Sequence, residues 1–60
     1  MSSYIEFVNR IQTRAQINGR KATDYSMSEI AKRKKYALAH GKTAGEFYTD
    51  LLREVNTPLI

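Results

Sequence analysis

Apolar residues recur every three or four positions in three stretches of this 60-residue chain, which is the spacing of one buried helix face. The clearest stripe lies near the C-terminus and consists of Ala44, Phe47, Tyr48, Leu51, Leu52 and Val55. The stripe near the N-terminus consists of Tyr4, Ile5, Val8, Ile11 and Ala15, with Phe7 at its edge. A weaker middle stripe, interrupted at Lys34, consists of Met27, Ile30, Ala31, Ala37 and Leu38. The pattern predicts three amphipathic helices.

Each stripe begins with the same start signal, a Ser or Thr followed three residues later by Glu. The pairs are Ser3 with Glu6, Ser26 with Glu29, and Thr43 with Glu46. In such a capping box the hydroxyl accepts from the backbone N–H of the glutamate, whose carboxylate accepts from the N–H of the cap residue. Stop signals follow at Gly19, Gly41 and Pro58. Together these signals predict an all-α fold with helices at 4–18, 27–40 and 44–55.

The two connections differ in length, and the longer one leaves an alternative open. Residues 41–43 form a short turn, so the second and third helices are expected to be neighbours. Residues 19–26 are long enough for a loop or a brief strand. A short β-ribbon at 20–25, shared between two copies, is therefore the main departure from three helices. Nothing in the sequence marks a second domain, and we expect one small helical domain over 1–60.

Length and composition exclude most elaborate chemistry. A chain of this size buries only about 60% of its unfolded surface, so we expect self-association, as a homodimer, to supplement the core. The chain has no Cys and one histidine, His40, so we expect no disulfide, metal site, cofactor or enzymatic activity. The apolar runs are too short to span a membrane, and the N-terminus lacks the pattern of a secretory signal. We expect a cytoplasmic protein with no membrane partner.

Positive charge gathers in the middle of the chain. The formal net charge is +4, but residues 19–42 hold seven basic and two acidic residues, whereas residues 43–60 hold one basic and three acidic residues. Such clustering is typical of a phosphate-binding surface, and an ordinary solvated basic face is the alternative. We expect double-stranded DNA as the partner. The candidate contacts are Arg20, Lys21, Lys32, Arg33, Lys35 and Lys42.

The third predicted helix has the opposite character. Glu46, Asp50 and Glu54 recur at i, i+4 and i+8 and form an acidic ridge beside the apolar stripe. This ridge is either an ordinary solvated face or meets a basic partner surface, for which the middle helix of a second copy is one candidate. It argues against a conventional helix-turn-helix with this helix in a DNA groove. Tyr25 and Tyr36 flank the basic segment, where they either stack on exposed bases or pack against the core.

The segment ALAHGKTAGEFYTDLL, from residue 37 to residue 52, resembles the helix-turn-helix half of ribbon-helix-helix repressors of the Arc and MetJ kind. The positions that fit that family are Gly41, Phe47, Tyr48, Leu51 and Leu52. The resemblance covers residues 20–55 and implies a small DNA-binding regulator of transcription. It implies a strand at 20–25 that pairs with its twin in a dimer and reads the major groove. It also implies that backbone N–H groups at Thr43 and Ala44 bind a phosphate.

A protein-binding module is the alternative from a different functional class. An inhibitor or adaptor of this kind would dock its first helix on a larger protein. The apolar residues available for such docking are Tyr4, Phe7, Val8 and Ile11, which offer more apolar area than a minimal core needs.

Overall fold

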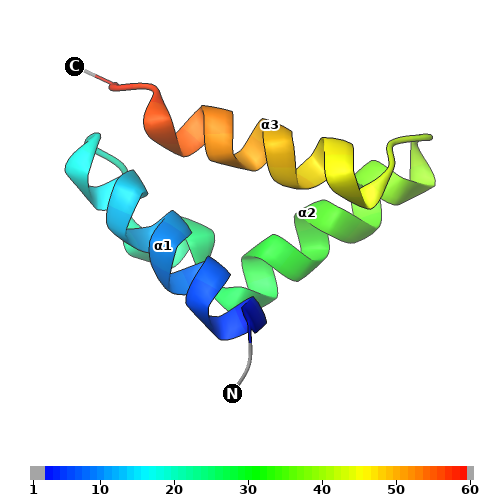
Figure 1. The fold of residues 1–60 in the computed structure, drawn as a ribbon, viewed down its shortest axis with the longest axis horizontal. Coiled ribbons are helices and arrows are strands. Elements are labelled where there is room, and N and C mark those ends of the chain that lie inside the picture. The colour runs from blue at the N-terminus through cyan, green and yellow to red at the C-terminus, as the bar shows by residue number, and fades with distance from the viewer. Residues whose placement is uncertain (1–2, 60) are drawn as a thin grey trace.

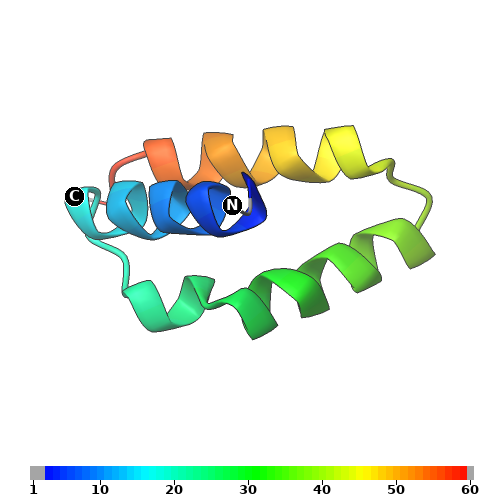
Figure 2. The ribbon, with the colours of Figure 1, turned by 60° about the horizontal axis from the view of Figure 1, so that its bottom comes forward.

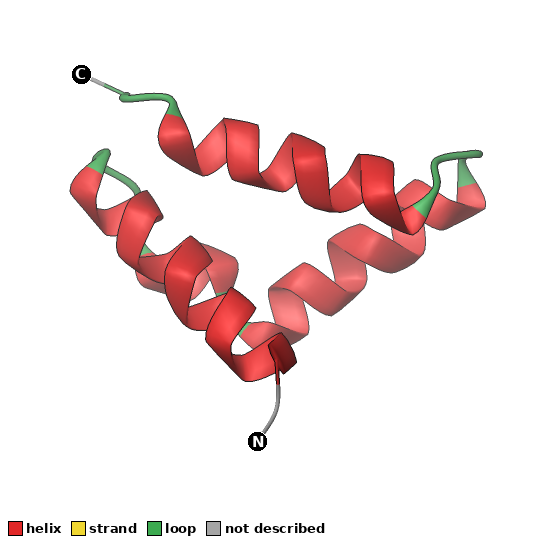
Figure 3. Ribbon diagram, in the orientation of Figure 1, coloured by secondary structure: helices red, strands yellow, loops and turns green. Residues whose placement is uncertain are grey.

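The computed structural model describes residues 3–59 and contains three α-helices and one short 3₁₀ helix. Helix α1 spans Ser3–Ile17, the 3₁₀ helix η1 spans Ala22–Tyr25, α2 spans Met27–Ala39 and α3 spans Ala44–Asn56 (Figure 1). The predicted three-helix, all-α architecture is confirmed, with helix ends within one residue of the expected ones. No strand is present within residues 3–59, so the β-ribbon considered for 20–25 is not observed (Figure 3).

The helices form the three sides of a flat triangle measuring 31 × 30 × 16 Å. Helix α3 runs from the end of α2 back to the end of α1 and packs against both (Figure 1). In Figure 2, α1 and α3 lie on one side of the molecule and α2 on the other. Two hydrogen bonds close the triangle, because the backbone N–H of Leu59 donates to the carbonyl of Asn18 and the Asn18 amide donates to the carbonyl of Val55.

One apolar core fills the space between the elements. Its buried members are Val8, Ile11, Ala15, Tyr25, Ile30, Phe47, Leu51 and Val55. Helices α1 and α3 each supply three of these side chains, whereas α2 supplies Ile30 alone. The weak middle stripe of the sequence therefore corresponds to a helix that is anchored at one core position. The Lys34 ammonium, which interrupts that stripe, donates to the Tyr48 hydroxyl at 3.1 Å.

The helix starts agree with two of the three predicted caps. At α3 the capping box is complete, because the Glu46 N–H donates to the Thr43 hydroxyl at 3.1 Å and the Thr43 N–H donates to the Glu46 carboxylate at 2.9 Å. At α2 the Ser26 hydroxyl accepts from the Glu29 N–H at 3.3 Å. Ser3 is already the first residue of α1, so it is not the cap that the sequence pattern predicted.

The predicted stop signals operate through glycine. Gly19 and Gly41 have φ angles of 91° and 89°, in the left-handed region that favours glycine. After Gly41, the Lys42 N–H donates to the carbonyl of Ala37 at 3.0 Å, which closes the last turn of α2 as a Schellman motif. The same arrangement follows Gly19 at the end of α1, where the Arg20 N–H donates to the carbonyl of Ala15 at 2.7 Å.

Candidate nucleic-acid interface

The acidic ridge of α3 faces the basic residues of its own chain. The Glu54 carboxylate accepts from the Arg33 guanidinium of α2 at 2.8 Å, and the Asp50 carboxylate accepts from the Lys42 ammonium in the turn before α3. The sequence predicts a solvated face or contact with a basic partner surface, whereas Asp50 and Glu54 pair with cations of their own chain. Two of the predicted DNA contacts, Arg33 and Lys42, are therefore held in intramolecular ion pairs.

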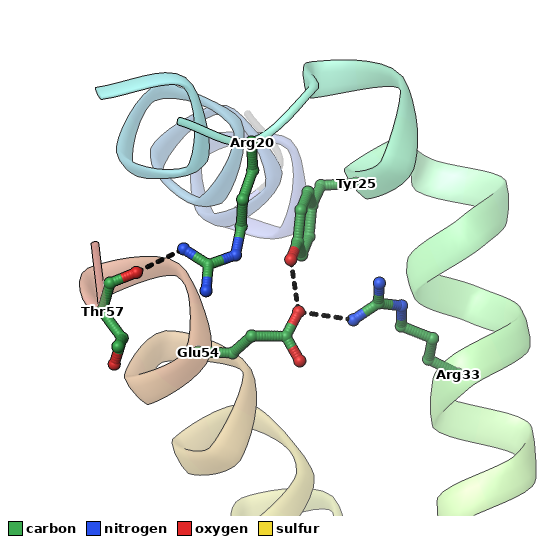
Figure 4. A network of polar contacts seen from close by, with 5 residues as sticks. All are labelled: Arg20, Tyr25, Arg33, Glu54 and Thr57. Carbon is green, nitrogen blue, oxygen red and sulfur yellow. Dashed lines mark hydrogen bonds and ion pairs between the residues drawn. The ribbon is translucent and has the colours of Figure 1, made fainter. Parts of the chain in front are cut away.

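Glu54 is the centre of a polar network that joins η1, α2 and α3 (Figure 4). Its Oε2 atom accepts from both the Tyr25 hydroxyl and the Arg33 guanidinium, and that guanidinium lies 4.8 Å from the centre of the Tyr25 ring. Arg20 lies beside this network, and its guanidinium donates to the backbone carbonyl of Thr57 (Figure 4). Arg20, a predicted DNA contact, therefore also links the turn before η1 to the C-terminal segment.

The ion pairs of α3 hold their carboxylates in the ionised state at neutral pH. Partial burial acts to raise the pKa of Glu54, but the hydrogen bonds from Tyr25 and Arg33 outweigh burial and hold that pKa below its ordinary value. Hydrogen bonding to Lys42 lowers the pKa of Asp50 in the same way. Both carboxylates are consequently ionised at neutral pH and neutralise the cations beside them.

The surface of α2 opposite the buried Ile30 faces solvent and does not contact the acidic residues of α3. With about 100° between successive residues, this surface gathers side chains that are all solvent-exposed. We call it the outer α2 face, and it consists of Ser28, Lys32, Lys35, Tyr36 and Ala39. No member of this face is acidic, and Glu29 lies at its edge, 3.6 Å from the Lys32 ammonium. Within residues 3–59, Lys35 takes part in no ion pair.

The remaining predicted DNA contacts are divided between exposed and occupied positions. Lys21 is exposed in the turn before η1. Thr43, which the family resemblance assigned to a phosphate, has its N–H and hydroxyl engaged with Glu46. The N–H of the cap residue is thus already bonded to a carboxylate of the chain, and hydrogen bonds from Thr43 lower the pKa of Glu46.

The four residues expected for a protein-binding surface fall into a buried pair and a pair that lines a hollow. Val8 and Ile11 lie in the core, with 3% and 0% of their surface exposed, so they do not face a partner in this fold. Tyr4 and Phe7 line a shallow apolar hollow between the start of α1 and Tyr48 of α3. The Phe7 and Tyr48 rings meet edge to face with centroids 5.0 Å apart, which gives this hollow an aromatic wall.

The sequence interpretation did not single out the Glu54 network. The signal that could have revealed it is the short turn 41–43, because it places an acidic helix directly beside a basic one.

No protein-family model matches this chain, and searches of curated proteins and of solved structures found no similar protein. None of the helices within residues 3–59 has the length and apolar character needed to cross a membrane.

Proposed function

We propose that the chain is a small DNA-binding regulator that contacts phosphates through the outer α2 face. The observation that carries the proposal is the division of charge around α2. Two of the three acidic residues of α3 pair with Arg33 and Lys42, whereas Lys32 and Lys35 extend from a face that has no acidic member. Two cations of the chain are therefore available to a polyanion on one side of one helix.

The physical properties of this face suit a phosphate backbone. Lys32 and Lys35 are three positions apart, which places them as neighbours on a helix surface. The pair between Lys32 and Glu29 is exposed, with 77% and 43% of the two side chains accessible, so it is easily exchanged for a phosphate. Lys21 supplies a further exposed cation. Each phosphate neutralised would release counterions and give the binding a marked salt dependence.

A ribbon-helix-helix dimer is the other way in which the chain could bind DNA. It would require residues 20–25 to leave η1 and form a strand that pairs with a second copy. Tyr25 is 3% exposed and its hydroxyl is bonded to Glu54, so this change would remove a core side chain and open the polar network. These contacts favour α2 over a ribbon as the DNA-binding element.

Binding of a blunt DNA duplex, measured as a function of salt, tests the proposal. For two lysine contacts we expect a slope of about −2 in log affinity against log salt. The double variant Lys32→Gln, Lys35→Gln should lose most of this slope and bind roughly tenfold more weakly at low salt. The matched control is Arg10→Gln, Arg14→Gln, which removes the same charge from exposed positions of α1. Absence of binding at low salt, or an equal loss in both double variants, would overturn the proposal.

The apolar hollow supports protein binding as a second candidate function. Tyr4, Phe7 and Tyr48 present aromatic surface there, as a docking site for a larger protein would. In this case Phe7→Glu should abolish capture of the partner while the helical circular dichroism signal is retained. Unchanged partner binding in that variant would count against the hollow as a docking site.

A further inference from the structure

Tyr36 and His40 form a stacked pair of rings at the C-terminal end of α2. The ring centroids are 4.0 Å apart and the ring planes are inclined by 26°. Tyr36 is 67% exposed, so one face of its ring rests on His40 and the other is open to solvent. Within residues 3–59 no group forms a hydrogen bond with the Tyr36 hydroxyl. A large aromatic surface is therefore displayed beside the lysines of the outer α2 face.

The pair is held in place before any ligand arrives. Nδ1 of His40 donates to the backbone carbonyl of Tyr36 at 2.8 Å, which fixes the imidazole against the phenol ring. His40 is also the C-cap residue of α2, and its own N–H donates to the carbonyl of Tyr36 at 3.1 Å. A ring ordered in this way loses little conformational freedom when another flat group stacks on it.

Two other tyrosines, Tyr25 and Tyr48, make contacts inside the fold. Tyr25 lies in the core and donates to Glu54, and Tyr48 packs against Phe7 and accepts from Lys34. Tyr36 has no comparable role, although it and Tyr25 both flank the run of basic residues at 32–35. Its exposure is therefore not explained by the packing of this chain.

We propose that the outer α2 face binds DNA that presents unpaired nucleotides, with a base stacked on the open face of Tyr36. This inference rests on the proposed function, because Lys32 and Lys35 would bind the phosphates that flank the stacked base. Lys32 lies one turn before Tyr36 on the same helix surface, and Lys35 is the residue next to Tyr36, about 100° around the helix, so one lysine lies along the helix from Tyr36 and the other lies around it. Aromatic stacking beside cations is the general means of binding single-stranded nucleic acid.

The DNA ligand that this proposal implies is a duplex that carries a single-stranded overhang. Bases inside a duplex are stacked on one another and do not offer a free face, whereas those of an overhang do. Because any base has a π face, the preference would be for unpaired structure and not for a particular sequence.

The test compares three DNA ligands by fluorescence anisotropy: a blunt duplex, the same duplex with a short 3′ thymidine overhang, and the duplex with an abasic overhang of equal length. The abasic overhang supplies the same phosphates without bases. We expect the thymidine overhang to bind roughly tenfold more tightly than the abasic one. Tyr36→Ala should remove this difference, whereas Tyr36→Phe should keep it. Circular dichroism checks that each variant retains its helices.

The outcomes separate this inference from the proposed function. Equal affinity for the thymidine and abasic overhangs would overturn the stacking proposal, while salt-dependent binding of the blunt duplex would still support the lysine face. A Tyr36→Ala variant that keeps the thymidine preference would also overturn it. Failure of the chain to bind any of the three ligands at low salt would overturn both proposals.

Discussion

The phenol hydroxyl of Tyr25 donates a hydrogen bond to the carboxylate of Glu54, 29 residues later in the chain. The same carboxylate oxygen accepts from Arg33 at 2.8 Å. Because Tyr25 belongs to η1, Arg33 to α2 and Glu54 to α3, one carboxylate joins three of the four elements. The network compensates for the small contribution of α2 to the apolar core, and several properties of the fold should depend on it.

Tyr25→Phe should lower the stability of the fold while leaving its core filled. The substitution removes the hydrogen bond to Glu54 but keeps the buried ring. We expect a loss of about 1 kcal/mol in the free energy of unfolding, which lowers the melting temperature of a domain of this size by about 4–8 °C. Thermal unfolding followed by circular dichroism measures this shift. Tyr36→Phe is the matched control, and an equal shift in both variants would contradict the assignment.

Glu54 should make the fold sensitive to acid. Burial acts to raise its pKa, but the hydrogen bonds from Tyr25 and Arg33 prevail and keep the pKa below the ordinary value of 4.5. For a carboxyl whose pKa is depressed by folding, the stabilisation is complete above the ordinary value and is lost as the pH falls through the folded-state value. Glu54→Gln cannot titrate, so its melting temperature should fall less than that of the wild type between about pH 6 and pH 3.

The control for this experiment is Glu6→Gln, which changes the same charge at an exposed position of α1. It should retain the acid sensitivity of the wild type. Melting temperatures of the wild type and Glu54→Gln that decline in parallel would show that Glu54 does not contribute to this sensitivity.

The three helices could be predicted because their signals are local. An apolar stripe, a capping residue and a terminating glycine all act within a few residues, as at Thr43 and Gly41. Helix η1 lacks such a signal, because its four residues, Ala22–Tyr25, show no apolar period. It is specified by the packing of η1 against α1 and α2, with Tyr25 buried, which the local sequence does not reveal.

The sequence could predict where basic residues cluster, but not which of them are paired with acidic residues of the same chain. The basic segment was evident, but the pairing of Arg33 with Glu54 depends on the angle between α2 and α3. Likewise, Tyr25 and Tyr36 both flank the run of basic residues at 32–35, and the sequence alone does not distinguish their roles. Tertiary packing distinguishes them, because it buries the first and exposes 67% of the second.

Ile30→Ala should be the most damaging single truncation in α2. Ile30 is fully buried and is the one core residue that this helix contributes within residues 3–59. Removing a buried Ile side chain costs about 2–5 kcal/mol, which approaches the whole stability of a small domain. Urea unfolding should show a large loss or an unfolded variant. Ile17→Ala, at a position 66% exposed, should change the free energy of unfolding by less than about 0.5 kcal/mol.

Glu29→Gln should strengthen DNA binding by the outer α2 face. The Glu29 carboxylate lies 3.6 Å from the Lys32 ammonium, so the substitution releases this lysine for a phosphate. Exposed pairs of this kind contribute at most about 1 kcal/mol, which sets the expected gain at about two- to fivefold. Binding of a blunt duplex at low salt measures the gain. Glu6→Gln makes the same charge change away from this face, and an equal gain there would argue that net charge alone controls affinity.

The two glycines at the turn into α3 should respond to alanine in opposite directions. At Gly41, an added Cβ meets no atom within 4 Å, but the φ angle of +89° is unfavourable for an L-residue and should cost about 1 kcal/mol. Gly45 lies inside the first turn of α3, where its Cβ would make an ordinary contact of 3.9 Å with the Thr43 hydroxyl. Alanine there restricts the unfolded chain and favours helix, so we expect a gain of about 0.5–1 kcal/mol. Urea unfolding of the two variants distinguishes the effects, and destabilisation by Gly45→Ala would show that the cap at Thr43 does not tolerate the added methyl group.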